Sequence, residues 1–150
     1  MTKKADFNAD EWTKVVEGPM LAGMRVVTAD RGGTIRESLA MGKVYAQARQ
    51  DQEASELLDE LVSSPPALDP QRMQGAGDIA AASTDRLKEA VVLLNEKGSA
   101  EEVAAYRQFV VAVARAAAEA HKEGSFIGIG GKQVSEKEQA ALDGIGAALA

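Results

Sequence analysis

The sequence predicts an all-α fold, a single-domain bundle of about six or seven helices spanning residues 1–150. Apolar residues recur at helical spacing along most of the chain, and no stretch alternates apolar and polar residues as a half-buried strand would. Four Asn/Ser/Thr-x-x-Glu capping boxes mark helix starts. Abundant alanine favours helices and supports a bundle.

The first predicted helices lie before residue 30. The capping box Asn8-x-x-Glu11 opens a short amphipathic helix. The pair Gly18-Pro19 is expected to end it and to start another, because proline suits the first turn of a helix. Residues 19–29 are apolar apart from one arginine, which predicts a buried helix that is too short to span a membrane.

Two further helices precede a long loop. Thr34-x-x-Glu37 opens a helix that runs to about Gln50. Residues 54–62 carry apolar side chains at i, i+3, i+4, i+7 and i+8, an amphipathic stripe. Residues 63–77 hold three of the four prolines and predict a long Pro/Gly-rich loop.

The second half of the chain is also predicted to be helical. The helical pattern resumes at Asp78, and Ser99-x-x-Glu102 then opens the longest helix, to about Lys122. The polar side of that helix is narrow, so we expect it to be central to the core. A glycine-rich apolar loop is predicted at residues 124–134, and Ser135-x-x-Glu138 opens the last helix.

The composition excludes several classes of function. The chain has no cysteine, so it forms no disulfide framework, thiolate zinc site or cysteine nucleophile by itself. The net charge of −6 and the 4% aromatic content argue against a nucleic-acid surface. The longest strongly apolar run is 109–114, so we expect neither a signal peptide nor a transmembrane segment. We therefore expect a cytoplasmic protein.

The glycine-rich loop does not match a phosphate-binding motif. A Walker A loop ending at Gly131 would need glycine where the chain has Phe126, and the dinucleotide pattern would need a preceding strand. Large apolar residues in such a loop either fold back over the core or bind a partner. The residues that would form the partner-binding loop are Phe126, Ile127, Ile129, Gly130 and Gly131.

The single histidine, His121, lies on the apolar stripe of the longest helix. It is either a core or boundary residue with a local hydrogen bond, or a group that transfers protons or binds a metal. The di-iron pattern needs Glu-x-x-His pairs, and Ala118 precedes this histidine instead. An enzyme would have to pair His121 with a carboxylate such as Glu119 or Glu138, and we assign no catalytic residues.

The two ends of the chain resemble each other. Each has an apolar helix, a glycine-containing connection and a helix opened by a capping box. This similarity reflects either two related helix–turn–helix halves or the fact that capping boxes recur at helix starts for local reasons. It also resembles the tellurite-resistance TerB-like helical family of bacterial proteins. The matching stretches are Thr28-Ala29-Asp30 with Thr34 and Glu37, and Ala120 with Ser135 and Glu138.

The resemblance implies metal binding by acidic residues at these turns, here Asp30, Glu37 and Glu138. Hard divalent cations need several oxygen ligands held together. The sequence departs from the family where Arg31 follows the aspartate and where His121 replaces the second aspartate. The alternative is structural, with the two glutamates bonding backbone amides in capping boxes and the aspartate shaping a turn.

Three functions remain after these tests. The first is a non-enzymatic helical protein-binding or stress-associated module, with a protein partner or self-association and with no cofactor. The second is a TerB-like protein that binds a divalent metal ion through its acidic turn residues. The third is a small enzyme that uses His121 with a carboxylate.

Overall fold

The structure is a computed structural model of the chain, and it describes residues 2–29, 34–50, 56–63, 76–124 and 136–150. The side chains of residues 34–38, 76–78 and 121–124 fall outside this description. The described residues form one short 3-10 helix and six α-helices, and they contain no strand. The predicted all-α, single-domain bundle is confirmed. The elements are η1 (Lys4–Asp6), α1 (Ala9–Ala29), α2 (Thr34–Gln50), α3 (Glu56–Ser63), α4 (Ala76–Lys97), α5 (Ala100–Gly124) and α6 (Glu136–Leu149).

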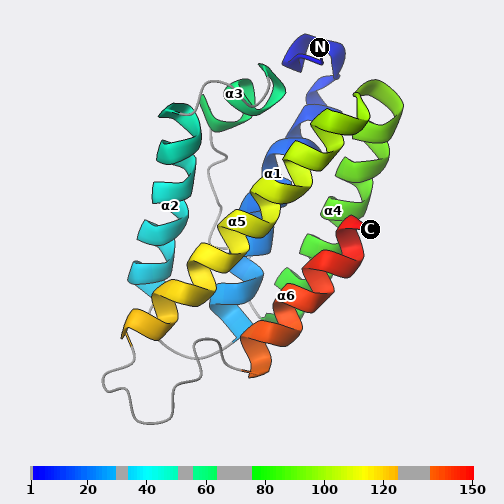
Figure 1. The fold of residues 1–150 in the computed structure, drawn as a ribbon. Helices are drawn as coiled ribbons and strands as arrows, with labels where there is room; N and C mark the ends of the chain where they lie inside the picture. Colours follow the sequence, from blue (N-terminus) through cyan, green and yellow to red (C-terminus); the bar gives the residue numbers. More distant parts are fainter. Residues whose placement is uncertain (1, 30–33, 51–55, 64–75, 125–135) are drawn as a thin grey trace.

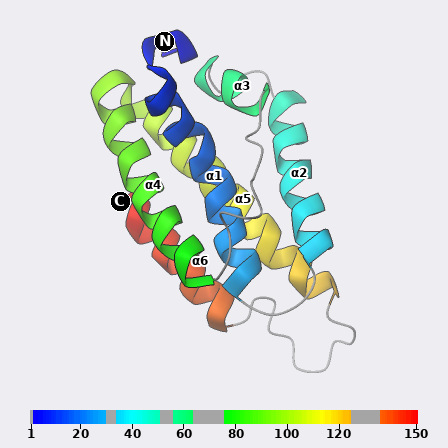
Figure 2. The same ribbon diagram turned by 180° about the vertical axis from the view of Figure 1, so that it is seen from behind.

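Helix α5 lies at the centre of the bundle, as its narrow polar side predicts. It packs against α1 and α2 most extensively, and it also contacts α3, α4 and α6. Helices α4 and α6 cover one side of the α1–α5 pair, while α2 and α3 lie on the other side (Figures 1 and 2). The fully buried side chains of α5 are Tyr106, Val110, Val113, Ala114, Ala117 and Ala118.

The buried faces of α3 and α4 agree with the sequence pattern. The stripe predicted within residues 54–62 supplies four buried side chains of α3, and one face of α4 supplies four more. These residues are Leu57, Leu58, Leu61 and Val62 of α3, and Leu87, Ala90, Val91 and Leu94 of α4. Helix α4 begins at Ala76, slightly before the expected Asp78, so the predicted loop is shorter at that end.

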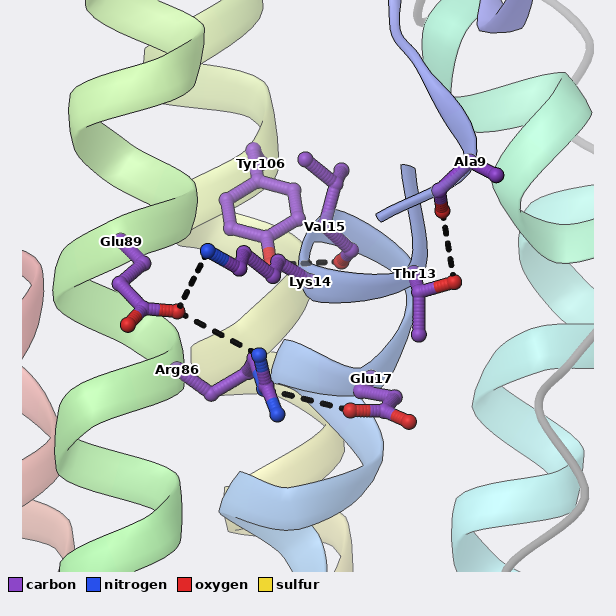
Figure 3. Close-up of polar contacts among 8 residues, drawn as sticks. All are labelled: Ala9, Thr13, Lys14, Val15, Glu17, Arg86, Glu89 and Tyr106. Carbon is purple, nitrogen blue, oxygen red and sulfur yellow. Dashed lines mark hydrogen bonds and ion pairs between the residues drawn. The ribbon is translucent and has the colours of Figure 1, made fainter. Parts of the chain in front are cut away.

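The predicted break at Gly18-Pro19 is wrong, because α1 runs as one helix from Ala9 to Ala29 with Pro19 inside it. Proline has no N–H, so the carbonyl of Val15, four residues earlier, loses its helical donor. The hydroxyl of Tyr106 on α5 donates to that carbonyl at 2.7 Å (Figure 3). Burial raises the pKa of Tyr106, which keeps the hydroxyl protonated for this bond.

Gly18 provides the space for this contact. A Cβ atom at Gly18 would collide with the Tyr106 hydroxyl and would press on Leu87 of α4. The sequence pair Gly18-Pro19 therefore serves a contact between helices instead of a helix end. Around the contact, the ion pairs Lys14–Glu89 and Arg86–Glu17 join α1 to α4, and Arg86 also pairs with Glu89 within α4 (Figure 3).

Two of the four predicted capping boxes are described in full, and both are confirmed. At the start of α1, the Asn8 side chain accepts the Glu11 N–H at 2.9 Å, and the Glu11 carboxylate accepts the Asn8 N–H at 2.9 Å. At the start of α5, Ser99 and Glu102 exchange the same pair of bonds at 3.2 and 2.9 Å. The side chains of Thr34, Glu37 and Ser135, from the other two boxes, lie outside the described residues.

The N-terminal segment is bound to the start of α5 through Glu102. The Glu102 carboxylate accepts the Thr2 N–H at 2.7 Å and the Thr2 hydroxyl at 2.6 Å, in addition to its capping bond. Burial acts to raise the pKa of Glu102, but the hydrogen bonds from Thr2 and Ser99 outweigh it and lower the pKa overall. The ionised carboxylate is therefore part of the folded structure.

Candidate functional site

The residues predicted to bind a metal are only partly described. Asp30 lies outside the described residues, and Glu37 lies on α2 with its side chain outside the description. Glu138 lies on α6, is 1% exposed and already has an interaction partner. Among the described side chains, no group of three or more His, Asp or Glu residues is arranged to hold a metal ion. The metal site stays a prediction.

The other predicted functional residues are placed as follows. The partner-binding loop, Phe126, Ile127, Ile129, Gly130 and Gly131, lies outside the described residues, between α5 and α6 in the sequence. The side chain of His121 is also outside the description, so its pairing with a carboxylate stays a prediction. Glu119 is described, and its exposed side chain lines a groove between α5 and α6.

This groove, which we call the α5–α6 groove, has a volume of about 430 Å³. Helices α5 and α6 run in opposite directions along it (Figure 1). Its lining combines apolar side chains, two of them half-buried, with polar side chains that are exposed. The lining residues are Val111, Ala114, Arg115, Ala118 and Glu119 of α5, and Gln139, Leu142, Asp143, Ile145 and Gly146 of α6.

Small residues keep the two helices from filling the groove. Ala114 and Ala118 line the groove from α5 with small side chains that are fully buried, and Gly146 contributes no side chain from α6. A Cβ atom added at Gly146 would meet no atom within 4 Å, so the space beside it is open. The half-buried Val111 and Leu142 are therefore accessible from this open space.

The polar side chains give the groove both signs of charge. On α6, the Gln139 side-chain amide donates to the Asp143 carboxylate at 3.0 Å, which holds two of the polar side chains in place. On α5, Arg115 and Glu119 are exposed, and neither belongs to an ion pair among the described residues. Among the described residues, no side chain neutralises these two charges of α5.

Two buried polar atoms have no hydrogen-bond partner among the described residues, the Nε of Arg107 and the hydroxyl of Tyr45. Arg107 precedes Val111 by four residues, which places it on the same face of α5, one turn beyond the groove. Tyr45 lies on α2, edge-on to Phe109 at 5.1 Å, and burial raises its pKa, so it stays neutral.

The chemistry of the groove favours binding over catalysis. Its described lining offers two carboxylates, one guanidinium and one amide, and it offers no hydroxyl or imidazole. A nucleophile beside a base, the arrangement that covalent catalysis needs, is therefore not formed by these lining residues. Apolar side chains bordered by a polar rim are typical of surfaces that bind other molecules.

The fold and the groove define a small all-α bundle with an open, partly apolar groove on its surface. Comparison with known protein families, curated proteins and solved structures finds no match to this chain. The sequence contains part of the signal for the groove, since Arg115 and Glu119 belong to the narrow polar side of α5. Ala114 and Ala118 are buried, as the apolar side of α5 predicts, but periodicity does not reveal how far apart two helices lie.

Proposed function

We propose that this chain is a helical binding module that takes an amphipathic helix of a protein partner into the α5–α6 groove. The open, half-apolar lining between two antiparallel helices is the observation that carries the proposal. An amphipathic helix binds such a groove by laying its apolar face along it. The missing side chain at Gly146 favours this occupant, because it lets a third helix approach the half-buried Val111 and Leu142 closely.

The charges of the groove specify the partner further. Arg115 would pair with an acidic side chain of the bound helix, and Glu119 and Asp143 would pair with basic ones. The groove includes residues 111–119 of α5, about 12 Å of helix at 1.5 Å per residue. The bound segment therefore contacts the groove over about two helical turns, with apolar residues at i, i+3 or i+4, and i+7.

Two glycines provide a matched pair of variants for the test. Gly146 lines the groove, whereas Gly42 lies on the exposed side of α2, and an added Cβ meets nothing within 4 Å at either position. Gly146→Leu would fill the groove, while Gly42→Leu adds the same side chain elsewhere. Partners are captured from a native lysate with each protein and identified, and synthetic peptides covering their helices are then titrated against all three proteins.

We expect Gly146→Leu to weaken peptide binding at least about tenfold, a loss of roughly 1.4 kcal/mol, and Gly42→Leu to leave it unchanged. Equal affinity of the three proteins for the peptide would contradict the proposal. So would a failure of the wild-type protein to capture any chain. Concentration-dependent dimerisation that Gly146→Leu abolishes would replace the partner helix with a second copy of this chain.

A further inference from the structure

Arg25 is an arginine held where three helices meet. It extends from α1, and its Nη1 donates to the Thr84 hydroxyl of α4 at 3.0 Å. On the third side lies Gly144 of α6, where an added Cβ would collide with the guanidinium. The absence of a side chain at residue 144 therefore makes room for this group. Arg25 is the only charged residue among residues 19–29 of the chain.

The other cations that join α1 to α4 differ from Arg25 in one respect. Lys14, Arg86 and Lys97 have side chains that are 31–35% exposed, and each pairs with a carboxylate at 3.1–3.4 Å. Arg25 is also half-buried, yet it belongs to no ion pair among the described residues. Its described partner is a neutral hydroxyl.

Among the described residues, this arrangement leaves strong donors of Arg25 without an acceptor. A guanidinium carries five N–H groups in a rigid fork that matches the oxygens of a carboxylate or a phosphate, and the described residues occupy one of them. The Thr84 oxygen accepts that bond, so its own hydrogen is free to donate, and no bond from it is formed within the described residues. A half-buried charge without a counter-charge is also unfavourable, which a bound anion would relieve.

We propose that Arg25 and Thr84 form an oxyanion-binding site at the junction of α1, α4 and α6. One oxygen of the anion would accept from the free edge of the guanidinium, and another would accept from the Thr84 hydroxyl. Charge-assisted bonds of this kind are the stronger class of hydrogen bond in proteins. Gly144 makes room for the guanidinium itself on the α6 side, and the site is independent of the function proposed for the α5–α6 groove.

The test is the thermal stability of the intact chain in increasing inorganic phosphate, or in increasing acetate, at an ionic strength kept constant with sodium chloride. A ligand that binds only the folded state raises the melting temperature as its concentration rises. The variants are Arg25→Gln, which removes the charge, Arg25→Lys, which removes the fork, and Thr84→Val, which removes the hydroxyl. Arg49→Gln, at an exposed arginine of α2, is the control for the loss of one positive charge.

We expect phosphate, acetate or both to raise the melting temperature of the wild-type protein. The control variant Arg49→Gln should show a rise of the same size. Arg25→Gln and Arg25→Lys should weaken the apparent anion affinity at least about tenfold, and Thr84→Val should weaken it less. The two anions distinguish a phosphate site from a carboxylate site. No rise in wild-type stability with either anion, or an equal rise in Arg25→Gln, would overturn the proposal.

Discussion

Helix α5 is flanked by α2 on one side and by α6 on the other, and glycines play opposite parts in the two contacts. On the α2 side, Gly23 of α1 leaves room for Met41 of α2 beside Val113 of α5, and Tyr45 packs edge-on against Phe109. On the α6 side, Gly146 faces open space. The same residue type thus closes one flank of α5 and opens the other.

The difference shows that a glycine within a helix is informative only together with what lies opposite it. Gly18 and Gly23 admit side chains from neighbouring helices, so a Cβ at either position would collide with Tyr106 or Met41. Gly146 admits nothing from the described residues, so it leaves room for a molecule from outside. Substitutions at these glycines and at their contacts test this contrast, with the largest effects expected at the closed contacts.

The largest effect is expected for Gly18→Ala. The added methyl group displaces the Tyr106 hydroxyl, so overpacking is combined with the loss of the bond to Val15. We expect the free energy of unfolding to fall by roughly 2 kcal/mol, measured by chemical denaturation. Gly42→Ala, at an open position of α2, should instead raise it slightly because alanine favours helix. A rise for both variants would mean that Gly18 is not a packing constraint.

Removing one oxygen atom gives a smaller effect at the same contact. Tyr106→Phe keeps the ring and leaves the Val15 carbonyl without the donor that replaces the missing N–H of Pro19. We expect the free energy of unfolding to fall by about 1–2 kcal/mol. Restoring the N–H with Pro19→Ala in the same chain should reduce this loss, which a double-mutant cycle would measure. Strictly additive losses would contradict the proposed exchange of one donor for another.

The start of α5 predicts a pH dependence. The pKa of Glu102 is lower in the folded state, so its stabilising contribution is present at neutral pH and is lost as the pH falls through that lowered pKa. Below about pH 5 we expect the wild-type protein to lose stability more steeply than Glu102→Gln. Glu101→Gln, at an exposed glutamate on the same turn, is the control and should retain the wild-type slope. If the stability of all three proteins fell equally with decreasing pH, this role of Glu102 would be refuted.

The smallest effect belongs to the open flank. Gly146→Ala adds a methyl group to a helix without a collision, so the free energy of unfolding should rise by about 0.5–1 kcal/mol. Thermal or chemical denaturation of both variants is the measurement. The free energy of unfolding should rise in Gly146→Ala and fall in Gly18→Ala, although both replace glycine with alanine. A destabilised Gly146→Ala would mean that the groove is filled in solution.

The parts of the fold that depend on neighbours in sequence could be predicted. The capping boxes at Asn8 and Ser99 need only residues three positions apart. The periodic spacing of apolar residues identifies the buried faces of the helices. The continuity of α1 through Pro19 could not be predicted, because the group that permits it lies on another helix. The α5–α6 groove depends on the spacing between helices, and the environment of Arg25 depends on three helices meeting.

The hydrogen bond between Tyr106 and Val15 also has a consequence for synthesis on the ribosome. The two residues are 91 positions apart, so α1 leaves the ribosome well before its partner exists. At about 5–20 residues per second, the Val15 carbonyl must rely on water for several seconds. During that time the first helix of the chain has a hydrated gap beside its proline, and the gap closes only when α5 has been made.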